Sequence, residues 1–252
     1  MVDLRKQEVV LLISKDESYL VDVSNRIFHT KSGTIDLGKL IGYRVGNKIK
    51  THLGKIFYVA KPNIKDFLER RAKRMPQIIM PKDAGLILAY TGVSQGSFVV
   101  DIGTGSGFLA IFIANYIRPG KIVTYENDKK ILKVAKENIK LSGLSEFIKV
   151  KNKDARKGIG EKNVDLVTVD IQTPEKVIKH AYKSLKVGGY LVVYSPTVEE
   201  VIAVTKEIRR LNFSSVNTVE NIVREWQTER TTRPRTMGLM HTGFLIFTRR
   251  IR

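Results

Sequence analysis

The chain has 252 residues, no cysteine, and 44 Lys and Arg residues against 25 Asp and Glu residues, which gives a formal charge of +19. The lack of cysteine excludes a disulfide framework, cysteine-ligated zinc, iron–sulfur clusters and a thiol nucleophile, and the four scattered histidines predict no metal site. No apolar run approaches the ~18 residues that span a membrane, and charged residues stand where a signal peptide is apolar, so we expect a cytoplasmic protein.

The N-terminal region is predicted to form a small β domain. Three apolar runs are typical of short strands: 9–13, 19–23 and 55–60. Five glycines between them supply turns, which favours a small β-barrel or β-sandwich. Pro62 interrupts the pattern, and 64–74 is predicted to be a charged helix. We therefore expect a β-barrel-like domain over 1–68 and a second domain over 69–252.

The second domain alternates between predicted strands and helices. Strands are expected at 98–102, 121–125, 148–150, 164–169, 190–194 and 243–247, with a further strand-like segment near Val216. Helices are expected at 108–116, 128–142, 174–185 and 197–211. Gly188-Gly189 has the composition of a cap that ends the third of these helices. This alternation predicts an α/β, doubly wound parallel sheet that is covered on both faces.

A glycine-rich loop follows the strand at 98–102 and leads into a helix. Its sequence, DIGTGSG, contains Asp101, Gly103, Gly105, Ser106 and Gly107. Glycines at such a turn let the backbone approach a ligand at a helix N-terminus. The acidic residue before the first glycine suits a positively charged group better than a pyrophosphate. The loop resembles the first motif of the methyltransferases that use S-adenosylmethionine (SAM).

Three more acidic residues follow later strands of the same predicted sheet. Glu126 ends the second strand, where a carboxylate can accept both ribose hydroxyls of a nucleotide cofactor. Asp154-Ala155 follows the third strand and resembles the segment that binds the adenine amino group in SAM enzymes. Asp170 ends the fourth strand, where it is a candidate catalytic residue, a cofactor contact or simply a helix N-cap. Carboxyl ends of parallel strands share one edge, so we expect these residues to line one crevice.

The basic residues are densest at the two ends of the chain. Residues 1–75 carry 16 basic and 8 acidic side chains, 76–200 carry 18 and 13, and 201–252 carry 10 and 4. A strongly basic balance is typical of proteins that bind nucleic acid. The pattern suggests a chemical centre between two basic contact surfaces.

Segments outside the glycine loop carry a more specific resemblance. Residues 28–36 (FHTKSGTID), 77–85 (QIIMPKDAG) and 233–245 (RPRTMGLMHTGFL), together with Asp170, resemble the TrmI family of tRNA (adenine-N1)-methyltransferases. The likeness runs from about residue 8 to residue 248. It implies a Rossmann-like SAM-dependent methyltransferase domain, tRNA as substrate, and methylation of adenine 58 in the T loop, with adenine 57 as a further candidate. It also implies a homotetramer, which would have to be held without disulfides.

The resemblance also assigns residues to the site. It implies that Gln77 contacts the cofactor and that Asp170 is the catalytic residue, which would accept a hydrogen bond from the N6 amino group of adenine. The substrate-binding candidates are Met80, Tyr194, Arg235 and His241. Many family members have Tyr at the position of Met80 and Pro at that of Gln172, so this chain would pack a softer side chain against the base.

The target base lies inside the folded tRNA and must be flipped out, which costs a few kcal/mol. Cations must offset this cost through phosphate contacts, and the candidates are Arg70, Arg71, Lys73, Arg74, Arg230, Arg233 and Arg235. Trp226 is expected to pack rather than to stack on a base. Two alternatives stay open: a protein-directed methyltransferase of the isoaspartate type, and a non-enzymatic RNA-binding module with a degenerate cofactor pocket.

Overall fold

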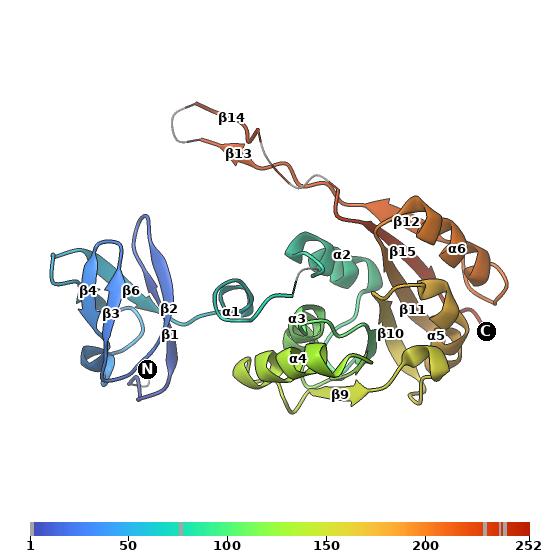
Figure 1. Cartoon of the computed structure of the whole chain (residues 1–252), viewed down its shortest axis with the longest axis horizontal. Coiled ribbons are helices and arrows are strands. Elements are labelled where there is room, and N and C mark those ends of the chain that lie inside the picture. Colours follow the sequence, from blue (N-terminus) through green and yellow to red (C-terminus); the bar gives the residue numbers. More distant parts are fainter. Residues whose placement is uncertain (1–2, 76–77, 229–230, 237, 239–240) are drawn as a thin grey trace. The chain divides into compact units, whose positions relative to one another are not determined.

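The structure is a computed structural model that describes residues 3–75, 78–228, 231–236, 238 and 241–252. It divides into two compact units, Met1–Ala72 and Lys73–Arg252 (Figure 1). The larger unit is built on a seven-stranded sheet with the order β12-β15-β11-β10-β7-β8-β9. Its strands are β7 (Phe98–Ile102), β8 (Lys121–Glu126), β9 (Ile148–Asn152), β10 (Val164–Val169), β11 (Leu185–Ser195), β12 (Asn217–Glu220) and β15 (Phe244–Arg249).

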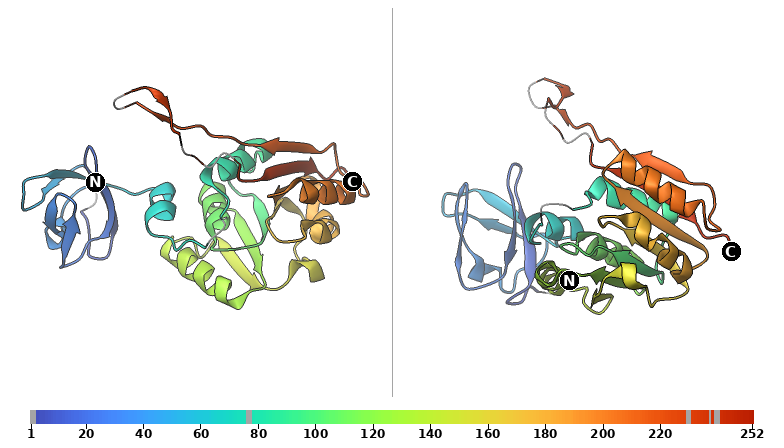
Figure 2. Two further views of the ribbon diagram at one scale, coloured as in Figure 1. Left: turned by 45° about the horizontal axis from the view of Figure 1, so that its top comes forward. Right: turned by 45° about the vertical axis from the view of Figure 1, so that its right-hand side comes forward.

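Five of these strands are parallel and wind outward in two directions from the centre. The chain passes from β7 to β8 and β9 on one side, and from β10 to β11 on the other. Connections between parallel strands are right-handed as a rule, so the helices that follow β7 and β8 cover one face of the sheet and those that follow β10 cover the other (Figure 2). The predicted doubly wound sheet is therefore confirmed, except that β15 runs antiparallel to both β11 and β12.

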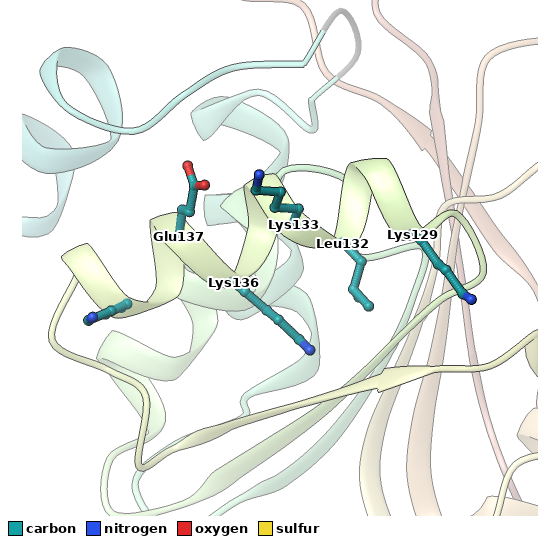
Figure 3. A pocket seen from close by; sticks show the side chains of 6 residues that line it. Lys129, Leu132, Lys133, Lys136 and Glu137 are labelled. Atoms are coloured by element: carbon teal, nitrogen blue, oxygen red, sulfur yellow. The ribbon is translucent and has the colours of Figure 1, made fainter.

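Six helical segments accompany this sheet. They are α2 (Pro81–Thr91), α3 (Phe108–Ile117), α4 (Lys129–Leu141), η3 (Pro174–Val177), α5 (Ile178–Ser184) and α6 (Val198–Ile208). A further short turn, η2, spans Ala155–Lys157. The helix α2 was not predicted, although Pro81 occupies its first position, where proline is favoured. The lysines of α4 surround a shallow hollow on its outer face (Figure 3).

The helix predicted over 174–185 is present as η3 and α5, which together cover 174–184, but the predicted helix cap at Gly188-Gly189 was wrong. The helical segment ends at Ser184, and β11 begins at once and runs through both Gly188 and Gly189. The pairing register of β10 and β11 shifts between Val164 and Leu166, so β11 bulges there. A Cβ on Gly189 would lie 2.8 Å from the carbonyl oxygen of Val164. The glycine pair therefore accommodates a β-bulge rather than capping a helix.

A small two-stranded hairpin lies between β12 and β15 in the chain. It pairs β13 (Trp226–Gln227) with β14 (Arg233–Pro234) and joins no other sheet. Trp226 is 55% exposed, so it lies outside the core of the larger unit, and its packing rather than stacking on a base stays a prediction.

The smaller unit is an antiparallel β structure with its own core. Its sheet has the order β2-β1-β6-β5, with β1 (Val9–Ile13), β2 (Ser18–Asp22), β5 (Lys48–Lys50) and β6 (Ile56–Ala60). A hairpin of β3 (Ile27–Thr30) and β4 (Gly33–Asp36) and the turn η1 (Leu37–Leu40) complete it. The core includes Leu12, Ile35, Leu37, Leu40 and Phe57, which are fully buried. The helix α1 (Ile64–Arg70) ends four residues earlier than predicted.

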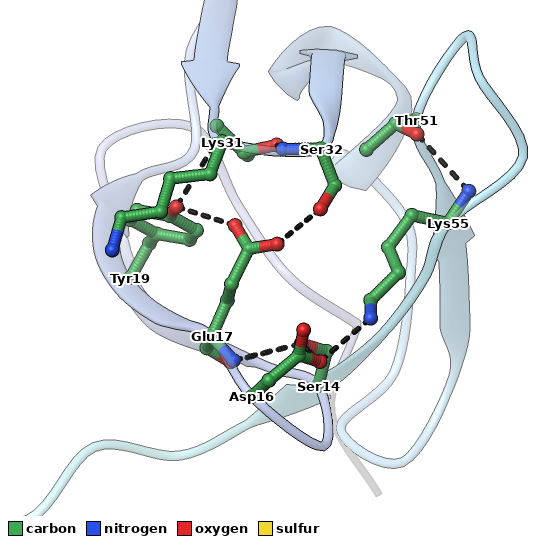
Figure 4. A network of polar contacts seen from close by, with 9 residues as sticks. Ser14, Asp16, Glu17, Tyr19, Lys31, Ser32, Thr51 and Lys55 are labelled. Atoms are coloured by element: carbon green, nitrogen blue, oxygen red, sulfur yellow. Dashed lines mark hydrogen bonds and ion pairs between the residues drawn. The ribbon is translucent and has the colours of Figure 1, made fainter.

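Polar contacts tie the hairpin of this unit to its sheet (Figure 4). Glu17 accepts hydrogen bonds from the hydroxyls of Tyr19 and Ser32, and these bonds lower the pKa of its carboxyl. The Tyr19 hydroxyl in turn accepts the backbone N–H of Lys31 at 3.1 Å. The network fixes the tip of the β3–β4 hairpin against the start of β2. Within the described residues, no helix is long and apolar enough to cross a membrane.

Candidate active site

The glycine loop lies between the C-terminal end of β7 and the start of α3. Gly103, Gly105 and Gly107 all have positive φ angles, of +96°, +52° and +85°. A Cβ on Gly103 would lie 2.0 Å from the carbonyl oxygen of Asp170, at the end of the neighbouring strand β10. Glycine at 103 is therefore required by the close approach of two strand ends. The backbone N–H of Asp170 donates to the carbonyl of Ile102 at 2.8 Å, which fixes the same junction.

Asp101 is buried in the sheet beneath this loop, with 1% of its surface exposed. Its two carboxylate oxygens accept hydrogen bonds from the hydroxyls of Thr124 and Thr168, each at 2.7 Å. Burial raises the pKa of Asp101 to about 6, against the lowering effect of these two bonds. The carboxylate therefore links the strands β7, β8 and β10, and its contact with a cofactor amino group stays a prediction.

Glu126 holds the outer side of the glycine loop. One carboxylate oxygen accepts the N–H of Gly105 at 3.2 Å, and the other accepts the N–H groups of Asn127 and Asp128 at 2.9 and 3.0 Å. A Cβ on Gly105 would meet nothing within 4 Å, so the space above the loop is open at this point. The structure thus brings the predicted ribose-binding carboxylate against the predicted cofactor loop.

The inner side of the loop is held by a residue that the sequence did not single out. Asn138 of α4 is fully buried, and its amide group donates to the carbonyls of Ser106 and Lys73 at 2.8 and 2.9 Å. Its amide oxygen accepts the N–H of Lys73 at 2.9 Å. The side chain of Ser106 is itself buried, and its hydroxyl has no partner among the described residues. Asn138 shows no sequence signal, because a polar residue inside an amphipathic helix normally faces solvent.

Asp154 and Ala155 follow β9, as expected. Asp154 caps the turn η2, and its carboxylate accepts two hydrogen bonds of 2.9 Å from the guanidinium of Arg156, which lowers its pKa. An adenine amino group would have to share this carboxylate with Arg156. Ala155 is buried beside it.

Asp170 is the most perturbed carboxyl group at the crevice. Burial raises its pKa to about 7, and the nearby charges of Asp101 and Glu200 add to the effect. Glu200 lies in the first turn of α6 and was not predicted as a site residue. One of its carboxylate oxygens is buried without a partner among the described residues, and burial raises its pKa. The crevice therefore holds more negative charge than its own protein partners neutralise, which favours a cationic ligand.

The predicted base-binding residues Tyr194, His241 and Met80 lie in β11, shortly before β15 and directly before α2. Tyr194, near the end of β11, donates its hydroxyl to the carbonyl of Thr242, and burial raises its pKa. A Cβ on Gly243 would lie 2.6 Å from its ring. His241 contacts Glu220 at 2.5 Å and the carbonyl of Pro196 at 3.1 Å, and the bond to Glu220 raises its pKa. Met80 is half-buried and directly precedes α2.

The remaining predicted residues are placed less favourably. Arg235 follows the β13–β14 hairpin and pairs with Glu225 at 3.3 Å. Gln77 and Arg230 lie outside the described residues.

Several candidate cations are already engaged: Arg70 donates to Ser18, Arg71 pairs with Asp22 at 2.8 Å, Lys73 pairs with Glu137 at 2.7 Å, and Arg74 lies over the ring of Phe108. The ends of the chain thus offer fewer unpaired cations than their composition suggests.

The hollow of about 460 Å³ on α4 is separate from this crevice (Figure 3). It is lined by Lys129, Leu132, Lys133, Lys136, Glu137 and Lys140, all from one helix. None of the strand-end carboxylates contributes to it. A shallow basic surface of this kind suits an extended polyanion rather than a small cofactor.

Comparisons with known proteins give one consistent picture. Residues 68–243 match the family model described as "tRNA methyltransferase complex GCD14 subunit". The chain is 31% identical to the tRNA (adenine(57)-N(1)/adenine(58)-N(1))-methyltransferase TrmI of Methanocaldococcus jannaschii, over 95% of this chain and 94% of that protein. It is 28% identical to the tRNA (adenine(58)-N(1))-methyltransferase TrmI of Thermus thermophilus, over 94% of each.

Solved structures agree with the fold. A SAM-dependent O-methyltransferase from Thermotoga maritima superimposes with a TM-score of 0.88 at 29% identity, covering 99% of this chain and 95% of that one. The tRNA (m1A58) methyltransferase TrmI from Aquifex aeolicus superimposes with a TM-score of 0.84 at 25% identity, covering 100% of both chains. The expected SAM-dependent methyltransferase fold with a small N-terminal β domain is confirmed.

The contact between Gly103 and Asp170 predicts a difference between two glycine substitutions. Gly105→Ala should cost roughly 1–2 kcal/mol in the free energy of unfolding, because only its left-handed backbone is strained. Gly103→Ala adds a clash with the Asp170 carbonyl and should cost at least ~2 kcal/mol more. Urea unfolding of both variants measures the difference. Equal losses would show that the two strand ends do not constrain residue 103.

The raised pKa of Asp170 predicts how stability changes with pH. The folded chain holds this proton up to about pH 7, whereas the carboxyl titrates near 3.8 in the unfolded chain. The stabilisation due to protonation is complete below pH ~4 and is lost as the pH rises through 7. Asp170→Asn should therefore be more stable than the wild type at pH 8, by a few kcal/mol at ~1.4 kcal/mol per pKa unit, and the two should converge near pH 4.

Asp165→Asn is the matched control, since it lies in the same strand but pairs with Lys186. This variant should show no gain in stability at pH 8. If Asp170→Asn is also no more stable than the wild type at pH 8, the burial of an ionisable Asp170 is wrong.

Proposed function

The chain belongs to the TrmI and GCD14 family of tRNA methyltransferases, and on that premise we propose that it transfers a methyl group from SAM to N1 of adenine 58 in the T loop of tRNA. Adenine 57 is a second candidate position, because the Methanocaldococcus jannaschii relative is named for both. The observation that carries the proposal is the placement of Asp170 at the end of β10: its backbone carbonyl lies against Gly103, and its half-buried carboxyl has a raised pKa beside other acidic groups that suit a cationic methyl donor.

The residues present fit SAM. The space above Gly105 is open, Glu126 is adjacent for two ribose hydroxyls, and the surplus negative charge of Asp101, Asp170 and Glu200 favours a sulfonium and an ammonium group. When bound, SAM supplies an electrophilic methyl group. Glu126 would have to release its bond to Gly105 to accept the ribose, and Asp154 would share its carboxylate between Arg156 and the adenine.

The protein's contribution to the transfer is alignment and charge stabilisation. Methyl transfer forms an N1–carbon bond, breaks the sulfur–carbon bond and moves a positive charge from sulfur to the target adenine. Holding two reactants in line contributes up to ~7–11 kcal/mol in favourable cases. Tyr194 and Met80 would hold the flipped base, and Asp170 would accept a hydrogen bond from the N6 amino group. That bond stabilises the charge, and Asp170 can then take the N6 proton that leaves the cationic product.

Two further features of the proposal concern assembly and location. We propose a homotetramer, which would be held without disulfides because the chain has no cysteine. The exposed apolar residues Ile222, Val223 and Trp226 in and before the β13–β14 hairpin support a surface for assembly. A monomeric mass in sedimentation velocity would contradict it. The proposed tRNA substrate also makes the cytoplasm the expected location.

A methylation assay tests the reaction and the role of Asp170 together. Incubation with SAM and unmodified tRNA should yield 1-methyladenosine, mapped by mass spectrometry of nuclease fragments to position 58. Asp170→Asn should lower the single-turnover rate by roughly 10²–10³-fold with SAM affinity retained. Near-wild-type turnover in this variant would remove Asp170 from the mechanism.

Parallel assays with an isoaspartyl peptide and with tRNA alone distinguish the alternatives. Methyl transfer to the peptide and not to tRNA would favour a protein-directed enzyme. Binding of tRNA without any methyl transfer would favour an RNA-binding module.

The lysines of α4 are the proposed phosphate contacts. This helix carries five lysines in 13 residues, and none forms an ion pair within 4 Å in the part of the chain that the structure describes. A triple variant, Lys133→Gln, Lys136→Gln and Lys140→Gln, should weaken tRNA binding and reduce the slope of log K against log salt by about 2–3, since each lost phosphate contact changes it by ~0.7–0.9. The measurement is a filter-binding titration at several salt concentrations.

The matched control has the same charge change and the same spacing elsewhere in the unit. Lys176→Gln, Lys179→Gln and Lys183→Gln lie on η3 and α5 and are also exposed. This control should retain the wild-type salt slope. Equal effects of both triple variants would mean that only the total charge matters.

A further inference from the structure

A buried ion pair at the start of α2 connects three distant parts of the chain. The ammonium of Lys82, 14% exposed, contacts the two carboxylate oxygens of Asp83 at 2.9 and 3.0 Å, and Asp83 is 1% exposed. The Lys82 ammonium also donates to the carbonyl of Asn221 at 2.5 Å and to the hydroxyl of Thr242 at 2.7 Å. Thr242 donates its own hydroxyl to Asp83 at 3.0 Å.

Each hydrogen-bond donor of the Lys82 ammonium has an acceptor in this cluster. The three ammonium protons of Lys82 have three kinds of acceptor, namely a carboxylate, a carbonyl and a hydroxyl. The side-chain amide of Asn221 returns a bond of 2.9 Å to the carbonyl of Lys82. A buried charge pair is stable only when its remaining hydrogen-bonding positions are satisfied, so the cluster holds its three segments in one fixed arrangement. We call Lys82, Asp83 and Thr242 the clamp.

The clamp adjoins the residues that face the target base in the proposed reaction. The carbonyl of Thr242 accepts the hydroxyl of Tyr194, and the next residue, Gly243, packs against the ring of Tyr194. On the other side of the clamp, Met80 precedes α2 by one residue. Two of the three segments that carried the specific family resemblance, 77–85 and 233–245, therefore meet in one cluster of polar contacts.

We propose that Lys82, Asp83 and Thr242 are positioning residues for the acceptor side of the reaction: they fix Tyr194 and the Met80 segment so that the target base is aligned with the methyl group. This proposal rests on the proposed function. The clamp shares no described contact with Asp101, Glu126 or the glycine loop. Thr124 and Thr168 hold Asp101 and the loop through their hydroxyls, and Glu126 is held by backbone N–H groups. Loosening it should therefore affect the base and leave cofactor binding intact.

The test uses the same mild substitution at three threonines, of which Thr168 and Thr248 are buried and Thr242 is half-buried. The more obvious variant, Lys82→Met, would leave the buried Asp83 without its ion-pair partner and can prevent folding. Thr242→Val keeps the shape and removes one hydroxyl from the clamp. Thr168→Val removes one hydroxyl from Asp101. Thr248→Val removes the bond that Thr248 donates to the carbonyl of Ser214 at 3.0 Å, at the far end of β15.

Three quantities are measured for each variant: the Kd for SAM by calorimetry, the single-turnover rate on tRNA at saturating SAM, and backbone hydrogen exchange. Thr242→Val should lower the rate by about tenfold or more, keep the Kd for SAM within about twofold, and speed exchange in residues 221–228 and 241–245. Thr168→Val should instead raise the Kd for SAM. Thr248→Val should match the wild type in both Kd and rate.

The outcomes separate the clamp from the proposed function. A wild-type chain that methylates no tRNA contradicts the proposed function itself. A wild-type chain that methylates tRNA, together with a Thr242→Val variant of equal rate, overturns the clamp alone. A Thr242→Val variant that loses SAM affinity in the same proportion as its rate also overturns it, because the effect would then not be confined to the acceptor side.

Discussion

The site depends on one buried carboxylate, that of Asp101, held in the middle of the sheet by two threonine hydroxyls. Removing a carboxylate from water is costly unless it accepts hydrogen bonds, and here the donors come from β8 and β10, the strands on either side of β7. Thr104 of the glycine loop bonds to Thr124 at 2.6 Å, so the loop joins the same network. The Asp101 carboxylate thus has two effects. Its hydrogen bonds align the ends of three strands, and its negative charge adds to the burial that raises the pKa of Asp170 on the neighbouring strand.

The chain separates its charges in space. Its surface is strongly basic, yet in the described residues no Lys or Arg forms an ion pair with Asp101, Asp170 or Glu200. A cation beside these carboxylates would neutralise the field that favours a positively charged methyl donor. Lysines on the outer face of α4 have the opposite advantage, since phosphates attract them from solvent and they need no desolvation. A nucleic acid substrate and a cationic cofactor therefore require two surfaces of opposite charge, and the fold keeps them apart.

Local patterns predicted much of this arrangement, and long-range contacts account for what they missed. The strands and the glycine loop follow from apolar periodicity and from glycine at positions of positive φ. The same local logic misassigned Gly188-Gly189, because a β-bulge and a helix cap both favour glycine. It also gave no signal for Asn138, which depends on contacts with Lys73 and Ser106, or for Glu200, whose charge acts on Asp170. The contact between Lys82 and Thr242 spans 160 positions in sequence, so only the folded sheet reveals that two separate motifs form one cluster.

Burial, together with the repulsion from Asp101 and Glu200, raises the pKa of Asp170, and those two carboxylates also favour the cationic methyl donor of the proposed reaction. A carboxyl with a pKa of about 7 is partly protonated near neutrality and would then be a poor hydrogen-bond acceptor. A cationic ligand in the crevice lowers that pKa, because it compensates the repulsion from Asp101 and Glu200. Cofactor binding would therefore ionise the residue that has to accept from the target base. After transfer the positive charge lies on the base, close to the Asp170 carboxylate. This carboxylate still has a high affinity for a proton, and the cationic product must lose one. Burial of Asp170 thus reduces the stability of the folded chain above neutral pH, and in return gives the site a base whose charge state responds to the bound cation.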